Sequence, residues 1–174
     1  MQEPNFEENK EDTEMSMEAF NNYVNSKLRR SKGVEENWVW QSMTNQIKKI
    51  MSHIFTAVQN RLVSKLGYFQ LFGLDFLIDD DMRVYLIEVN RTPGLGIDCK
   101  PGADVIPGLV DESVRLVVEC FEKAKAGKAL LPLQSLKGFE IIFPNKRICD
   151  RHAEVDKKQS PNDNSHSRGT CLIL

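Results

Sequence analysis

No stretch of this 174-residue sequence approaches the roughly 20 consecutive apolar residues that a membrane-spanning helix needs. The acidic N-terminus, Met-Gln-Glu-Pro, is unlike the basic start of a signal peptide. Basic residues are not in excess either, because 23 Lys and Arg stand against 25 Asp and Glu. A nucleic-acid-binding surface normally needs a concentrated basic patch. We therefore expect a globular cytoplasmic protein that binds no nucleic acid.

Cysteine is also sparse, and no C-x-x-C pair is present. The four cysteines are widely spaced, at Cys99, Cys120, Cys149 and Cys171. This spacing favours free thiols in a reducing compartment over a disulfide framework or a zinc site. The 41% hydrophobic content is enough for one domain with a real core.

Apolar periodicity predicts the regular elements. Residues recur at three- and four-residue steps over 15–28, 36–65 and 105–125, which predicts three helices. The second is the clearest, and we expect it to pack on a sheet, end at Gly67 and be anchored by Trp38 and Trp40.

Other segments have different patterns. Three prolines and four glycines in 92–108 indicate a loop, and 139–143 is typical of a final strand. Beyond Arg151 the composition predicts a flexible, disordered tail. The predicted fold class is α/β (α+β), with an antiparallel sheet packed against helices.

The most informative segment is 69–90, where two apolar, β-rich runs flank an acidic turn and predict a β-hairpin. Each run carries polar residues that a buried strand should avoid, namely Asp75 in the first and Glu88 and Asn90 in the second. Because an unpaired buried carboxylate is costly, such residues usually pair with a cation or coordinate a metal.

The length of the turn decides whether these three side chains can meet. Glu88 and Asn90 share a face, because side chains alternate along a strand. A four-residue loop at 80–83 places Asp75 opposite Glu88, and a two-residue loop at 80–81 places it diagonally. Either even-length loop keeps both carboxylates on one face, whereas an odd loop or a bulge would separate them.

A set of Asp, Glu and Asn oxygens suits a hard ion such as Mg²⁺, which usually shares its coordination sphere with substrate phosphates. We expect Asp79, Asp80 and Asp81 to form a solvated turn, and we assign their carboxylates no metal-binding role.

The hairpin closely resembles the metal-binding end of the tubulin–tyrosine ligase family of ATP-grasp ligases. The resemblance rests on Phe-Gly-x-Asp-Phe, on Leu-Ile-Glu-Val-Asn at this spacing, and on the following Asn-x-Thr-Pro-Gly-Leu. It extends over about residues 5–143. It implies that 1–150 form the C-terminal part of an ATP-grasp domain and that 151–174 are a separate tail.

The resemblance also implies an activity. Asp75, Glu88 and Asn90 match the family's metal ligands, and Glu88 and Asn90 are also expected to act in catalysis. The implied cofactors are ATP and Mg²⁺, and the implied partners are tubulin or microtubules and an amino acid, in a cytoskeletal setting. The implied activity is ATP-dependent ligation of an amino acid to tubulin through an acyl phosphate. The stretch 69–72 favours tyrosine, whereas Arg91-Thr92-Pro93 is more similar to glutamate- or glycine-adding members. We predict tyrosine, with glutamate or glycine as the alternatives.

Two other readings stay open. No Walker-type G-x-x-x-x-G-K motif is present, and the phosphate-gripping lysines of the family come from sequence upstream of the matching part. A non-catalytic, tubulin-binding or regulatory protein is therefore an alternative. A metal-dependent phosphohydrolase is disfavoured, because the extra ligands of a two-metal site are absent from the hairpin.

The last four residues, Cys171-Leu-Ile-Leu, match the C-a-a-X pattern for geranylgeranylation. One prenyl group would give only weak membrane association, because a second signal is normally needed. An accidental match is the competing interpretation.

Overall fold

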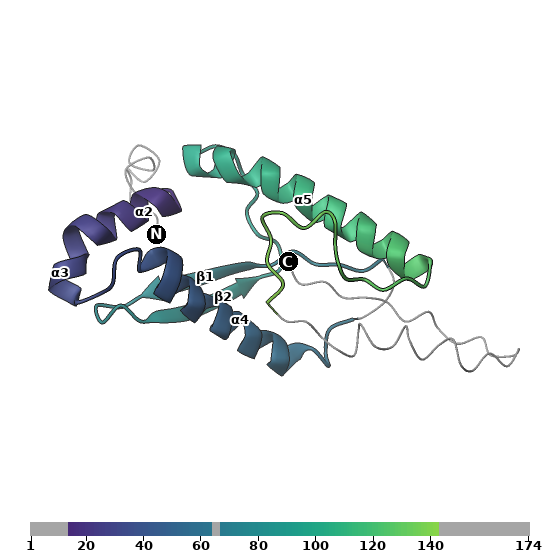
Figure 1. Cartoon of the computed structure of the whole chain (residues 1–174), viewed down its shortest axis with the longest axis horizontal. Coiled ribbons are helices and arrows are strands. Elements are labelled where there is room, and N and C mark those ends of the chain that lie inside the picture. Colours follow the sequence, from purple (N-terminus) through teal and green to yellow (C-terminus); the bar gives the residue numbers. More distant parts are fainter. Residues whose placement is uncertain (1–13, 64–66, 143–174) are drawn as a thin grey trace, which may run out of the picture. The chain divides into compact units, whose positions relative to one another are not determined.

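The computed structural model describes residues 14–63 and 67–142 (Figure 1). In chain order the elements are α2 (Met17–Tyr23), η1 (Val24–Leu28), α3 (Arg29–Lys32), η2 (Val39–Met43), α4 (Thr44–Val58), β1 (Gly73–Ile78), β2 (Val84–Asn90) and α5 (Lys100–Lys125). The mixture of helices with a small antiparallel sheet confirms the predicted α/β class. The chain divides into two compact units, and each is described by itself.

The first predicted helix is confirmed and continues beyond its predicted end. Ser16 caps α2, since its hydroxyl accepts a hydrogen bond from the Ala19 N–H at 3.1 Å. The chain passes through the π-helical turn η1 into α3. Gly33 ends the helical segment with a φ of 66°, in the left-handed region where glycine carries no Cβ penalty.

The second helix is shorter than its apolar pattern predicts. It is formed by η2 and α4, and α4 ends at Val58, so the predicted end at Gly67 is wrong. Trp38 is buried, as expected of a packing anchor. Trp40 is 50% exposed, so its predicted anchoring role is wrong. The reason is that Trp38 and Trp40 are two residues apart and so point to different sides of a helix.

The core of the first unit forms between the N-terminal helices and the hairpin. Its buried members are Val24, Trp38, Val39, Met43, Met82 and Val84, and Phe76 and Ile78 pack against them. The Gln46 side chain ties η2–α4 to the sheet, because its Oε1 accepts the Val84 N–H at 3.1 Å. One face of the hairpin is therefore covered by helices.

The second unit contains the C-terminal part of α5, where Leu116 and Cys120 are buried, and Leu130 in the following segment is buried as well. The helix begins at Lys100 and contains Pro107, so the predicted loop up to 108 is wrong over its last nine residues. Proline and glycine were expected to break this segment, and tertiary context overrides that preference. Residues 139–142 form no strand, which corrects the predicted final strand for that part.

Some expectations concern residues that the structure leaves undescribed. The predicted tail at 151–174 lies outside the described residues, as do Cys149 and Cys171. Cys99 and Cys120 are both free thiols. Among residues 14–63 and 67–142, no helix is both long and apolar enough to cross a bilayer.

Candidate functional site

The turn of the hairpin is a three-residue loop, a length between the two that the sequence predicted. The Asp79 N–H donates to the Arg83 carbonyl at 3.0 Å, and the Met82 N–H donates to the Asp79 carbonyl at 3.0 Å. These bonds enclose a loop of three residues, 80–82, so both predicted even-length loops are wrong. Met82 closes the loop with a φ of 60°, a left-handed conformation that accompanies three-residue hairpin loops.

The Asp79 carboxylate stabilises this turn, which fits the structural role expected for the acidic segment. Its Oδ1 accepts the N–H groups of Asp81 at 2.9 Å and Arg83 at 2.8 Å. The Arg83 N–H is the main reason that the pKa of Asp79 lies below its usual range. Asx-type bonding of this kind is a common way of fixing a turn.

The approach of Gly73 to Asn90 indicates that the register at the base of the hairpin differs from the register at its turn. A Cβ placed on Gly73 would lie 3.7 Å from the Asn90 Cβ, so the two positions share a face. Counting from the turn, where Asp79 pairs with Arg83, would instead put Gly73 opposite Val89. The two counts differ by one residue, which is the offset that a β-bulge introduces.

This offset bears directly on the three predicted metal ligands. With an odd loop alone, Asp75 would lie opposite Ile87 and away from the face of Glu88. In the register of the base, Gly73 and Asn90 share a face. Asp75 follows Gly73 by two residues and Glu88 precedes Asn90 by two, so all three predicted ligands lie on that face. The side chains of Asp75 and Glu88 are exposed, and that of Asn90 is half-buried. Their joint coordination of an ion stays a prediction.

The donor chemistry fits Mg²⁺, since these positions supply carboxylate and amide oxygens only. Within the described ranges, no group of three or more His, Cys, Asp or Glu side chains gathers to hold a metal ion. The three predicted ligands are not a group of this kind, because only Asp75 and Glu88 are carboxylates and the third donor is the amide of Asn90.

A side chain that the sequence interpretation missed organises the strand exit. Gln70 Nε2 donates to the carbonyl oxygens of Leu71 at 2.9 Å and of Arg91 at 2.7 Å. It thereby joins the chain entering β1 to the chain leaving β2, beside Gly73 and Asn90. The sequence signal that could have identified Gln70 is its position as a polar residue within the apolar run 69–72.

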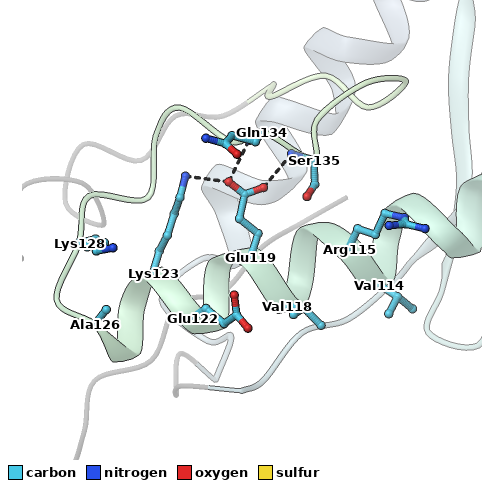
Figure 2. A pocket seen from close by; sticks show the side chains of 10 residues that line it. All are labelled: Val114, Arg115, Val118, Glu119, Glu122, Lys123, Ala126, Lys128, Gln134 and Ser135. Atoms are coloured by element: carbon cyan, nitrogen blue, oxygen red, sulfur yellow. Dashed lines mark hydrogen bonds and ion pairs between the residues drawn. The ribbon is translucent and has the colours of Figure 1, made fainter.

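A second polar cluster lies on α5, around a cavity of about 630 Å³ (Figure 2). Glu119 pairs with Lys123 Nζ at 2.7 Å and accepts the N–H groups of Gln134 and Ser135, each at 2.8 Å. Burial pushes the pKa of Glu119 up, but these three donors outweigh it and lower the pKa from 4.5 to about 2. Lys123 also donates to the carbonyls of Leu130 and Pro132.

One helical face of α5 therefore fixes the segment 130–139. Seven residues before Glu119, Glu112 accepts the N–H groups of Lys137 at 2.6 Å, Gly138 at 2.9 Å and Phe139 at 3.1 Å. These N–H groups, chiefly that of Lys137, hold the pKa of Glu112 below its usual range. Because the charged groups are engaged by the chain itself, the cluster supports structure, and the hairpin stays the candidate functional site.

Comparison with known proteins gives consistent relatives. The sequence profile of the Tubulin-tyrosine ligase family matches residues 2–125. A rat protein named Protein polyglycylase TTLL10 is 39% identical over 94% of this chain and 25% of its own length. The mouse protein of that name is 42% identical over 77% of this chain and 19% of its own length.

A human relative, 41% identical over 76% of this chain and 20% of its own length, is named Inactive polyglycylase TTLL10. The chain thus spans between about a fifth and a quarter of the length of these relatives. No solved structure matches it.

Proposed function

Because this chain belongs to the tubulin-tyrosine ligase family, we propose that it carries the metal-binding part of an ATP-dependent ligase that joins an amino acid to tubulin. One observation carries the proposal: at the hairpin base a Gly73 Cβ would lie 3.7 Å from the Asn90 Cβ. This approach supports the register in which Asp75, Glu88 and Asn90 share a face. We further propose that residues 1–150 are part of an ATP-grasp domain and that the protein works in the cytoplasm on the cytoskeleton.

In this proposal Asp75, Glu88 and Asn90 hold Mg²⁺, which would neutralise phosphate charge when bound with ATP. The chain's own contribution is positioning. Two strands fix the three oxygen donors, and the Gln70 amide holds the chain at the point where β1 begins and β2 ends. Preorganised donors of this kind lower the cost of assembling a charged site.

The proposed reaction transfers the γ-phosphoryl group of ATP to a tubulin carboxylate, and the amine of an amino acid then displaces phosphate. We propose glycine as the donor. The names of the rat and mouse relatives support glycine. The Asn-Arg-Thr-Pro sequence that begins at the last residue of β2 is similar to glutamate- or glycine-adding members and agrees with this choice without deciding it. The tyrosine favoured by residues 69–72 has no such support.

The proposal is tested by incubating the full chain with tubulin, ATP, Mg²⁺ and isotope-labelled glycine, glutamate or tyrosine. We expect glycine on tubulin by peptide mass spectrometry, and none when EDTA removes Mg²⁺. Incorporation of glutamate or tyrosine in place of glycine would show that the proposed amino acid is wrong and that the proposed ligase activity is right. The absence of any incorporation would refute ligase activity for this chain.

Substitutions within the hairpin separate the ligands from the turn. Asp75→Asn, Glu88→Gln and Asn90→Ala should each weaken Mg²⁺-dependent ATP binding by at least about tenfold. The matched controls are Asp80→Asn and Asp81→Asn, which change carboxylates of the turn and should leave this binding unchanged. Equal effects in both groups would contradict the assignment of the ligands.

A second candidate is a non-catalytic tubulin-binding protein, and the name of the human relative favours it. Titration calorimetry with ATP and Mg²⁺ discriminates between the two functions. A ligase must bind ATP and so gives a heat of binding. A non-catalytic protein would bind tubulin but give no heat of binding with ATP.

A further inference from the structure

The apolar side chains of the hairpin specify its register only weakly. On the covered face, Phe76 and Ile78 pack against the core of the first unit. On the other face, Leu77 and Ile87 are apolar as well, with exposed fractions of 52% and 62%. A slip by one residue moves each side chain to the opposite face, so here it would exchange apolar side chains for apolar ones. Polar contacts at the ends of the hairpin must therefore help to select the register.

The contacts at the turn fix the register at that end alone. The Asp79 N–H donates to the Arg83 carbonyl, and the Asp79 carboxylate accepts the Arg83 N–H at 2.8 Å. Counting from this pair would put Gly73 opposite Val89. A Cβ on Gly73 would instead lie 3.7 Å from the Asn90 Cβ, which indicates another register at the base. The base therefore needs a contact of its own.

Gln70 supplies a contact at this position. Its Nε2 donates to the Arg91 carbonyl at 2.7 Å and to the Leu71 carbonyl at 2.9 Å. Arg91 directly follows Asn90, the last residue of β2, so the hydrogen bonds of the strand pair no longer hold the chain there. The Gln70 amide extends the pairing by one residue and holds Asn90 from its C-terminal side.

Gly73 contacts the same exit segment, 91–93, from three residues further along the chain. A Cβ on Gly73 would lie 2.9 Å from the Pro93 Cβ, so glycine is what allows Pro93 to approach the start of β1 this closely. Gly73 thus permits the register of the base, but it has no side chain with which to hold it. The hydrogen bonds of Gln70 are directional and can do so.

We propose that Gln70 is a positioning residue that holds the base of the hairpin in the register of Gly73 and Asn90. It acts through the backbone, because both of its bonds are to carbonyl oxygens. In this register Asn90 and Asp75 share a face, whereas in the register of the turn they lie on opposite faces. The consequence for Mg²⁺ rests on the proposed function, but the role of Gln70 in the register does not.

The test compares the full chain with two variants of Gln70. Gln70→Met keeps the length of the side chain and removes the amide, and Gln70→Glu keeps its shape and replaces the donor with a carboxylate. Gln59→Met is the matched control. The Gln59 amide also donates to a backbone carbonyl, that of Thr56 at 3.1 Å, but it lies just after α4 and away from the exit segment in sequence.

Nuclear Overhauser contacts between the Gly73 α-protons and the Asn90 side chain report the register. We expect these contacts in the unmodified chain and in Gln59→Met, and we expect both Gln70 variants to lose them while circular dichroism shows unchanged helix content. Contacts that persist in either folded Gln70 variant would overturn the proposal, even if that variant unfolds at a lower temperature, because Gln70 would then contribute to stability alone. Loss of the contacts in Gln59→Met would overturn it as well.

The affinity for Mg²⁺ is a second readout, followed by the chemical shift of the Asn90 side-chain amide as MgCl₂ is added. Both Gln70 variants should weaken Mg²⁺ binding by at least about tenfold, as is typical when a residue that orients a ligand is lost. Equal Mg²⁺ affinity in the unmodified chain and the Gln70 variants would overturn the proposal. If the unmodified chain binds no Mg²⁺, the proposed function fails, and the contacts between Gly73 and Asn90 still decide the role of Gln70.

Discussion

At the scale of single residues, Glu119 shows how one carboxylate can organise a segment distant in sequence. Its side chain is 14% exposed and lies against backbone N–H groups 15 and 16 residues further along the chain. A carboxylate that accepts several N–H bonds and an ion pair forms stronger bonds than a neutral acceptor does. The helix thus fixes segment 130–139 without a strand or a disulfide.

We predict that Glu119→Gln lowers the free energy of unfolding by about 1–3 kcal/mol, because the amide cannot replace both the ion pair and the charge-assisted bonds. The measurement is urea denaturation at neutral pH. Glu122→Gln is the matched control, since Glu122 lies on the same helix and lines the same cavity but is exposed. An equal loss in the control would show that helix charge, rather than this contact, is responsible.

The low pKa of Glu119 predicts a direction for the effect of pH. Because folding lowers the pKa from 4.5 to about 2, the stabilisation is fully present above pH 4.5 and is lost as the pH falls towards 2. The stability difference between the unmodified chain and Glu119→Gln should therefore shrink between pH 4.5 and pH 2. Thermal unfolding at several pH values measures this difference. A difference that stays constant over this range would contradict the assignment.

At the scale of elements, the hairpin combines an odd loop at its turn with an even register at its base. The turn is fixed by Asp79 and the left-handed Met82, and the base by the approach of Gly73 to Asn90. The one-residue offset between them changes which side chains face Asp75. Turn length alone therefore does not determine the face of a residue several positions away.

We predict that Gly73→Ala destabilises the hairpin base, because its Cβ would lie 2.9 Å from the Pro93 Cβ. The cost should be about 1–3 kcal/mol, as is typical of overpacking. Gly94→Ala is the matched control, since a Cβ there meets nothing within 4 Å. Thermal unfolding measures both variants, and a control as destabilised as Gly73→Ala would show that loss of glycine flexibility is the cause.

In the whole molecule, the described chain has two compact units, and each contains buried apolar side chains. Val24 and Val39 are fully buried in the first, and Leu116 is fully buried in the second. The cluster of the first unit joins the N-terminal helices to the hairpin.

We predict that Val24→Ala and Leu116→Ala destabilise different regions. A buried Leu→Ala change costs about 2–5 kcal/mol, and the smaller Val→Ala change should cost less. Hydrogen exchange should accelerate around α2 and η2 in the first variant and around α5 and 130–139 in the second. Uniform acceleration across both units in either variant would indicate a single cooperative core.

The elements with a local signal could be predicted from the amino-acid sequence alone. The periods of the first two helices, the β-rich runs on either side of an acidic turn, and the motif that indicates the family are all read over a few residues. The candidate ligands Asp75, Glu88 and Asn90 were identified in this way, because polar residues within apolar runs are conspicuous without any coordinates.

The ends of these elements and the faces that they present depend on tertiary contacts. Helix α4 ends before its apolar stripe does, and α5 continues through Pro107. Residues 139–142 form no strand, and the Phe139 N–H donates to Glu112 instead. The three-residue turn, the register at Gly73 and the half-buried carboxylate of Glu119 likewise depend on contacts between distant segments. Such contacts leave little trace in local periodicity, because the free energy that selects them comes from packing and hydrogen bonds formed only in the folded chain.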